Sequence, residues 1–163
     1  MAEKRALVVG LGNLSRRDDG LGFFAVNAVR ARLGRAPLDE YDDGMNDLGH
    51  ETDFALVPQL SPELAEAAAQ CDRLVLVDAR VVGDEGVTVE EIGVQSAPSA
   101  RLLSHEMHAA EFLALIGALY GSRPSVFVVS VKGHDYDFGL GLSEEVEALL
   151  PSVVERVLAL IAE

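Results

Sequence analysis

The sequence predicts an α/β fold in which one mostly parallel sheet of about five strands carries helices on both faces. Short β-rich runs alternate with helical patterns along the chain. The run at 74–77 is apolar throughout, as expected for a parallel strand that is covered on both sides. The chain has 163 residues, of which 49% are hydrophobic, enough for one core. We therefore predict a single domain over residues 1–163.

The first third of the chain contains two predicted strands and one predicted helix. A β-rich run at 6–9 ends at a glycine, and a second run lies at 54–57. Between them, residues 18–33 carry an apolar stripe at helical spacing, with Asp18 as the expected N-cap. Residues 34–52 are rich in Asp, Gly and Pro, which predicts a loop. Met45, Leu48, Phe54 and Leu60 could form either a docking surface or an edge of the core.

The rest of the chain continues the same alternation. Three more strands are predicted, at 74–77, 86–92 and 126–131, and the second of these alternates as a half-exposed strand does. Three more helices are predicted, with N-caps at Ser61, Ser104 and Ser143. Pro151 should kink the last helix.

Composition excludes several classes of protein. The net charge is −14 and the basic residues are scattered, which argues against nucleic acid and anionic membranes as partners. Cys71 is the single cysteine, so no disulfide and no cysteine-based zinc site can form, and we expect it to be a small buried hydrophobe. We expect a cytoplasmic protein, because no apolar stretch is long enough to span a membrane and the N-terminus does not look like a signal peptide.

Acidic and histidine residues mark where chemistry is expected. In open α/β sheets, sites form at the carboxyl ends of strands. Asp18 and Asp19 follow the first predicted strand, Asp78 follows the third, and His105 lies in the first turn of the helix predicted after Ser104. A mixed carboxylate and imidazole site suits nickel or zinc with open positions. Structural alternatives remain: the aspartates could serve the helix start or a turn, and the histidine could be structural.

The glycine-rich loop after the first strand does not indicate a nucleotide site. Gly10 and Gly12 are followed by Ser15, so the dinucleotide pattern G-x-G-x-x-G is incomplete. The pair Asp18 and Asp19 would also repel a pyrophosphate. The nucleophile elbow G-x-S-x-G is absent from the sequence.

The same loop resembles a known motif. Residues 9–22, V-G-L-G-N-L-S-R-R-D-D-G-L-G, resemble the opening of hydrogenase maturation endopeptidases: a strand, Gly-x-Gly-Asn, four variable residues, Asp, an acidic residue and Gly-x-Gly. Three later segments are similar to the family in the same order. They are the strand that ends at Asp78, the segment 103–107 around His105, and the closing strand and loop 130–143.

The resemblance implies a fold, an activity and a set of site residues. The fold would be a three-layer α/β sandwich around a twisted, mostly parallel sheet. The activity would be metal-dependent removal of the C-terminal extension of a nickel-containing hydrogenase large-subunit precursor after nickel insertion. Asp19, Asp78 and His105 would recognise nickel presented by the precursor, and another divalent metal could occupy the site in isolation. The partner would be that precursor, and the enzyme a monomer or weak homo-oligomer.

The identity of the group that activates water stays open at this stage. Nickel could do so, or Asp18 or Asp78 could act as general base, with the N–H groups of Gly12 and Asn13 stabilising the oxyanion. Many family members carry Asp-Gly-Gly-Thr after the second strand, where this chain has 57–63, V-P-Q-L-S-P-E, and some have Glu at the position of Asp19.

Two other functions compete with the peptidase. A non-catalytic, metal-dependent chaperone for the large subunit would use the same three residues. Peptidyl-tRNA hydrolases also open with Gly-Leu-Gly-Asn, but they continue with Pro-Gly and later an Arg-His-Asn segment, which are missing here.

Overall fold

The computed structural model describes residues 4–94 and 107–163. Strands and helices alternate for most of this length, as the sequence predicts. Their bounds are β1 Ala6–Leu11, η1 Arg17–Gly20 (a 3-10 turn), α1 Leu21–Arg32, β2 Thr52–Val57, α2 Pro62–Ala69, β3 Arg73–Arg80, β4 Val87–Ile92, α3 Ala109–Tyr120, β5 Ser125–Lys132 and α4 Glu144–Ala162.

The described strands form one sheet in the order β2-β1-β3-β5-β4. β1 pairs in parallel with β2 and β3, β3 pairs in parallel with β5, and only β4, at one edge, runs antiparallel. This confirms the predicted five-stranded, mostly parallel sheet. Gly10 lies opposite both Leu56 and Val77, and Asp78 lies opposite Ser130, so the carboxyl ends of β1, β2, β3 and β5 reach the same edge of the sheet.

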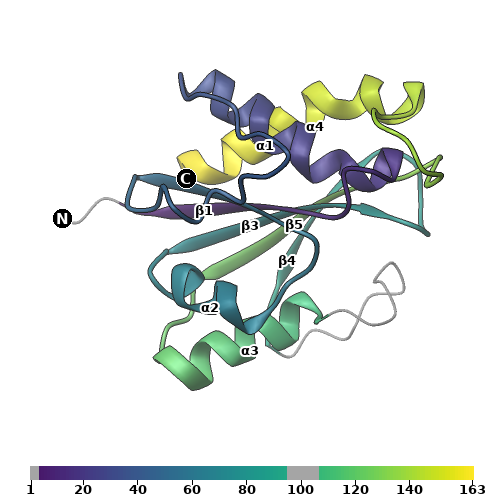
Figure 1. Ribbon diagram of the computed structural model, residues 1–163. Helices are drawn as coiled ribbons and strands as arrows, with labels where there is room; N and C mark the ends of the chain where they lie inside the picture. The colour runs from purple at the N-terminus through teal and green to yellow at the C-terminus, as the bar shows by residue number, and fades with distance from the viewer. Residues whose placement is uncertain (1–3, 95–106) are drawn as a thin grey trace.

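Helices cover both faces of the sheet (Figure 1). α1 and α4 lie on one face, and α2 and α3 lie on the other. Each face has its own apolar core. Side chains alternate across a strand, so Val75 and Val77 of β3 pack under α1 and α4, whereas Leu74 and Leu76 pack under α2 and α3. The result is the three-layer sandwich that the sequence predicts.

Several helix starts agree with the sequence. Ser61 and Ser143 occupy the N-cap positions of α2 and α4, and the Ser143 hydroxyl accepts from the backbone N–H of Val146 at 3.4 Å. Pro151 lies within α4. Cys71 is 5% exposed, as expected for a buried hydrophobe, and burial raises the pKa of its thiol to about 11.

Other boundaries differ from the prediction. The N-cap of α1 is Gly20 rather than Asp18, because η1 intervenes and turns the Asp18 side chain toward another loop. β3 continues to Arg80, so Asp78 lies within the strand instead of after it. α3 begins at Ala109 with His108 as its N-cap, later than predicted. The expected cap, Ser104, lies outside the described residues.

Of the four residues considered above as a docking surface or an edge of the core, most belong to the core. Phe54 and Leu60 are buried, Met45 packs against the core under α2 and α3, and Leu48 is exposed. None of the helices in the described ranges is long and apolar enough to cross a membrane.

Candidate functional site

Asp18 fastens the loop between β5 and α4 to the loop after β1. Its Oδ2 accepts from the backbone N–H groups of His134 and Asp135 at 2.7 and 2.9 Å. Ser143 donates its backbone N–H to Oδ1 at 2.7 Å and its hydroxyl to Oδ2 at 2.8 Å. These four hydrogen bonds occupy most of what a carboxylate can accept.

The environment of Asp18 keeps it ionised. Its side chain is fully buried, and burial alone would raise its pKa. The hydrogen bonds from Ser143, His134 and Asp135 act in the opposite direction, and the net pKa is lowered from the usual value. A buried carboxylate with this many donors is a poor general base, so we infer that Asp18 positions the site and does not accept a proton.

Backbone pairing joins the same two loops. The N–H of Arg17 donates to the carbonyl of Gly139 at 3.0 Å, and the N–H of Gly139 donates to the carbonyl of Ser15 at 2.9 Å. Asp18 adds a third bond, from its N–H to the carbonyl of Asp135 at 3.0 Å. Arg17 has φ +44°, a left-handed conformation that is uncommon for a non-glycine residue. Such backbone persists only where its surroundings hold it, as these bonds do here.

Asp19 points toward the end of β1. Its Oδ2 accepts the backbone N–H of Asn13 at 2.8 Å. Burial raises the pKa of this carboxyl, and the Asn13 hydrogen bond and the charge of Arg16 only partly offset that effect. Gly12 lets the two segments approach, since it has φ +115° and a Cβ there would stand 2.0 Å from the Asp19 carbonyl oxygen. The glycine of the motif therefore places an acidic group beside the loop.

Asp78 lies on the face of the sheet that α2 and α3 cover. Leu74 and Leu76 point to that face, and Asp78 continues the same alternation near the carboxyl end of β3. Its side chain is half-buried, and Oδ1 accepts the N–H of Ala79 at 2.8 Å. On the neighbouring strand, the residue opposite Asp78 is Ser130, whose hydroxyl lies 3.0 Å from that of Thr88.

Tyr136 lies within electrostatic reach of the three aspartates. Its hydroxyl donates to the carbonyl of Arg80 at 2.9 Å. Burial raises the pKa of this phenol, and the negative charges of Asp78, Asp19 and Asp18 raise it further. Gly133 packs against this ring: a Cβ there would stand 2.3 Å from the tyrosine oxygen, so a larger residue would make the ring shift. The sequence analysis missed Tyr136, although its place in the closing loop 130–143 was a signal.

The predicted metal set is only partly within the described residues. The structure brings Asp19 and Asp78 to one end of the sheet, and His105 lies outside the described residues. Within residues 4–94 and 107–163, no group of three His, Cys, Asp or Glu side chains is placed to hold a metal ion.

The backbone donors considered for an oxyanion are engaged in the structure. The N–H of Gly12 donates to the carbonyls of Val57 and Pro58, both at 3.2 Å, and the N–H of Asn13 donates to Asp19. Either group would have to exchange its partner to stabilise an oxyanion, so we assign neither of them that role.

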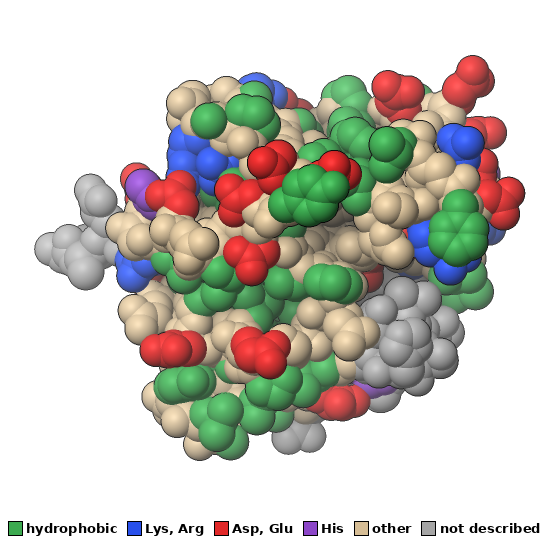
Figure 2. Space-filling model, viewed as in Figure 1, with side chains coloured by type: hydrophobic (Ala, Val, Ile, Leu, Met, Phe, Trp, Pro, Cys, Tyr) green, Lys and Arg blue, Asp and Glu red, His purple; other side chains and the backbone are tan. Residues whose placement is uncertain are grey.

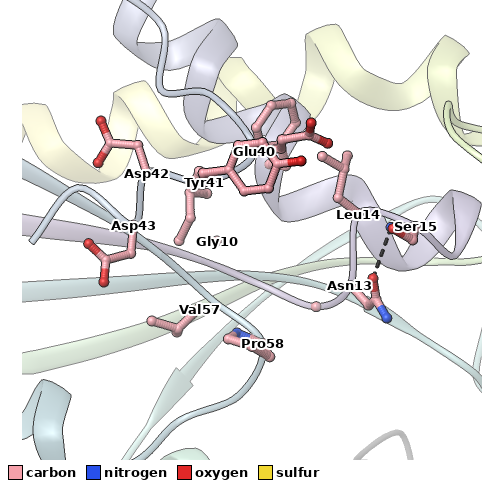
Figure 3. A pocket seen from close by; sticks show the side chains of 13 residues that line it. Gly10, Asn13, Leu14, Ser15, Glu40, Tyr41, Asp42, Asp43, Val57 and Pro58 are labelled. Carbon is pink, nitrogen blue, oxygen red and sulfur yellow. Dashed lines mark hydrogen bonds between the residues drawn. The ribbon is translucent and has the colours of Figure 1, made fainter.

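A groove of about 540 Å³ opens beside this region, between the loop after β1 and the loop before β2 (Figure 3). It is lined by Gly10, Gly12, Asn13, Leu14, Ser15, Phe23, Glu40, Tyr41, Asp42, Asp43, Leu56, Val57 and Pro58. In Figure 3, Leu14, Asn13 and Ser15 stand at one end of the groove and Asp42 and Asp43 at the other. Asn13 connects the groove to Asp19 through its backbone N–H.

Comparison with known proteins identifies the family. The family model described as hydrogenase maturation protease matches residues 57–160. The chain belongs to the hydrogenase maturation protease family. A curated relative from Methanocaldococcus jannaschii, whose name assigns it provisionally to these proteases, is 26% identical over 161 residues, which is 97% of each chain.

Solved structures of hydrogenase maturation proteases have the same fold. The endopeptidase HybD from E. coli is 23% identical, with a TM-score of 0.67 over 95% of this chain and 90% of that chain. HybD from Thermococcus kodakarensis is also 23% identical, with a TM-score of 0.62 over 96% of this chain and 99% of that chain. The resemblance read from the opening motif and the later segments is thereby confirmed at the level of family and fold.

Proposed function

We propose that this member of the hydrogenase maturation protease family is an endopeptidase that removes the C-terminal extension of a nickel-containing hydrogenase large-subunit precursor after nickel insertion. The observation that carries the proposal is that Asp19, bonded to the loop after β1, and Asp78, near the end of the neighbouring strand β3, lie at the same carboxyl edge of the sheet in a chain of this family. We propose Asp19, Asp78 and His105 as the residues that recognise the metal.

The chemistry of the two aspartates suits recognition of a cation. Asp19 is partly desolvated, and its raised pKa shows that the ionised form lacks full compensation from its neighbours. An approaching nickel ion would supply the missing positive charge and favour the ionised form. Carboxylate oxygens combined with one imidazole give a mixed ligand set that nickel accepts. Nickel is part of the substrate in this proposal, since the precursor already holds it.

Recognition of the metal would also position the peptide bond. A precursor held by its nickel ion has its C-terminal segment fixed beside the sheet edge, which turns cleavage into an intramolecular step. We propose that either the nickel ion or Asp78 activates the attacking water, since the carboxylate of Asp18 is already committed to four donors. Tyr136 then acts as a positioning residue that stays protonated among the three carboxylates.

The cellular setting follows from the proposed substrate. We propose a cytoplasmic enzyme that works on the precursor as a monomer or weak homo-oligomer, with no nucleic acid or membrane partner. The net charge of −14 agrees with the last point.

The test is to incubate the purified protein with the nickel-loaded large-subunit precursor from the same source and follow the precursor by mass spectrometry. We expect loss of one C-terminal peptide, dependent on nickel. Asp19→Asn, Asp78→Asn and His105→Ala should each abolish the loss while leaving the circular dichroism spectrum unchanged. Glu155→Gln, an exposed carboxylate paired with Arg32 on the α1 and α4 face, is the control and should cleave normally.

Two outcomes would contradict the proposal in different ways. Binding of the nickel-loaded precursor without cleavage would establish the metal-dependent chaperone in place of the peptidase. Normal cleavage by any one of the three variants would remove that residue from the recognition site.

A further inference from the structure

The groove beside the candidate site combines apolar walls with an acidic rim. Leu14, Phe23 and Pro58 contribute apolar surface, whereas Glu40, Asp42 and Asp43 contribute carboxylates. No lysine, arginine or histidine is among the lining residues in the described part of the chain. Figure 2 shows acidic side chains gathered around the middle of this face, beside hydrophobic ones. An occupant that complements the groove therefore has an apolar stem and a positive end.

The rim is held in place by the core on both sides. On one side, Leu38 is buried and exchanges two hydrogen bonds with the Asn27 side chain, at 2.8 and 2.9 Å. On the other side, the N–H of Leu56 in β2 donates to the carbonyl of Asp43 at 2.9 Å. Gly44 packs so closely on β2 that a Cβ would stand 2.4 Å from the Phe54 carbonyl. The backbone of the rim is thus held in place, which lowers the entropic cost of binding.

The aromatic ring of Tyr41 completes the site. Its side chain is 90% exposed although it lines the groove, and Figure 3 places it between Glu40 and Gly10. An exposed phenol ring beside carboxylates offers a guanidinium both a flat surface and hydrogen-bond acceptors. Among exposed residues, a large aromatic side chain at a groove is a common feature of binding surfaces.

We propose that this groove binds an arginine or lysine side chain of the extended substrate segment that lies next to the candidate site. The inference rests on the proposed function for the identity of the substrate. The groove adjoins the candidate site, because Asn13 lines the groove and donates its N–H to Asp19. The methylene stem packs against Leu14, Phe23 and Pro58, and the charged end reaches the carboxylates of the rim. The rim then determines which precursors the enzyme accepts, separately from recognition of the metal.

The experiment measures binding without requiring cleavage. The probe is the blocked tripeptide acetyl-Ala-Arg-Ala-amide, which is added to the 15N-labelled protein. The control peptide carries citrulline in place of arginine, because citrulline has nearly the shape of arginine without its charge. We expect the amide signals of Gly12, Asn13 and Tyr41 to shift in a saturable way with the arginine peptide. The citrulline peptide should bind at least about fivefold more weakly, as expected for the loss of a charge-assisted contact of about 1 kcal/mol.

A matched pair of variants assigns the effect to the rim. The triple variant Glu40→Gln, Asp42→Asn and Asp43→Asn should lose the preference for arginine. The Asn side chains can still accept the bonds that Asp42 and Asp43 receive from the N–H groups of Gly44 and Met45. Asp39→Asn is the control, since Asp39 accepts the N–H of Tyr41 in the same loop but does not line the groove. It should keep the preference.

The outcomes separate this inference from the proposed peptidase activity. Equal binding of the two peptides, or shifts outside the groove only, would overturn the inference even if the precursor is cleaved. Arginine-selective shifts that the triple variant abolishes would support it even if precursor cleavage fails. With a cleavable precursor, the triple variant should raise KM about fivefold or more and leave kcat nearly unchanged, whereas an equal loss in kcat would contradict a role confined to binding.

Discussion

Asp18 and Asp19 are neighbours in the chain, but their carboxylates meet different surroundings. Asp18 turns into the protein and receives four hydrogen bonds from the loop between β5 and α4. Asp19 turns to the end of β1, where its carboxylate accepts the backbone N–H of Asn13. The four bonds of Asp18 therefore hold the two loops together, whereas Asp19 is the carboxylate that we propose for metal recognition.

This division predicts different costs for the same substitution. Asp18→Asn should destabilise the fold by about 3 kcal/mol, because an amide group replaces an oxygen that faces N–H and O–H donors in a buried place. Asp19→Asn should change stability by less than about 1 kcal/mol. Urea denaturation, with the midpoints compared at an unchanged slope, measures both. Equal midpoints for the two variants would show that the Asp18 bonds contribute little.

The pH dependence of stability should also depend on Asp18. Burial alone would raise its pKa, but the hydrogen bonds from Ser143, His134 and Asp135 lower it below the usual 3.8. A carboxyl with a lower pKa in the folded state stabilises the fold above the unfolded value, and that contribution is lost as pH falls through the folded value. We expect the stability difference between wild type and Asp18→Asn to be constant from pH 7 to about 4.5 and to shrink below about pH 4. A difference that shrinks near pH 6 would contradict the lowered pKa.

At the scale of elements, the start of α1 packs against β1 through two glycines. A Cβ at Gly10 would stand 2.5 Å from the carbonyl oxygen of Gly22, and a Cβ at Gly22 would stand 2.6 Å from the backbone nitrogen of Leu11. All of these neighbours are backbone atoms, which cannot move aside without displacing the strand or the helix. The glycines of the opening motif thus set the distance between β1 and α1, and so the place of Asp19.

Adding a methyl group at this contact should be costly. We expect Gly22→Ala to destabilise the protein by about 2–4 kcal/mol and to reduce precursor cleavage beyond the loss of folded protein. Gly117→Ala in α3 is the matched control, because its Cβ would meet only the Ser122 carbonyl at 3.8 Å. Alanine is the better helix former, so this control should be stabilised by about 0.5–1 kcal/mol. Thermal denaturation of both variants measures these changes in stability. An unchanged melting temperature for Gly22→Ala would mean that α1 can move away from β1.

The elements also show what the sequence could and could not predict. All five strands in the described part of the chain overlap predicted ones, because their apolar runs reflect burial inside a sheet. The helix starts at Ser61 and Ser143 were predicted from local signals: a proline follows Ser61 at the first helical position, and the Ser143 hydroxyl caps its helix. The roles of Asp18 and Tyr136 were not predicted, because their hydrogen-bond partners are distant in sequence. Asp18 accepts from Ser143, and Tyr136 donates to the carbonyl of Arg80. Local patterns carry no information about such contacts.

For the candidate site, the sequence predicts the place of the acidic residues, and their roles stay predictions. The sequence indicated Asp19 and Asp78 at the carboxyl edge of the sheet, and both lie at that edge in the structure. It could not show that the N–H groups of Gly12 and Asn13 already have acceptors. The groove was also hidden, since its rim and its floor come from segments that only the fold brings together.

At the scale of the whole molecule, the excess of negative charge should limit stability. The chain has 27 acidic and 13 basic residues, so the carboxylates outnumber their possible partners. Several of the basic residues are already engaged, as Arg5 is with Asp53 at 2.9 Å and Arg35 with Asp47 at 3.1 Å. The remaining carboxylates repel one another over distances that salt can screen, since the Debye length falls from about 30 Å at 0.01 M to about 8 Å at 0.15 M salt.

Salt should therefore stabilise this protein at neutral pH. We expect the melting temperature at pH 7.5 to rise by about 3 °C or more between 0.01 and 0.2 M NaCl, with EDTA present so that divalent ions play no part. Near pH 4.5, the pI calculated from the sequence, the net charge vanishes and the same increase in salt should have little effect. Differential scanning calorimetry at both pH values measures the two shifts. A melting temperature that falls with salt at pH 7.5 would instead show that the ion pairs outweigh the repulsion, because screening weakens attraction and repulsion alike.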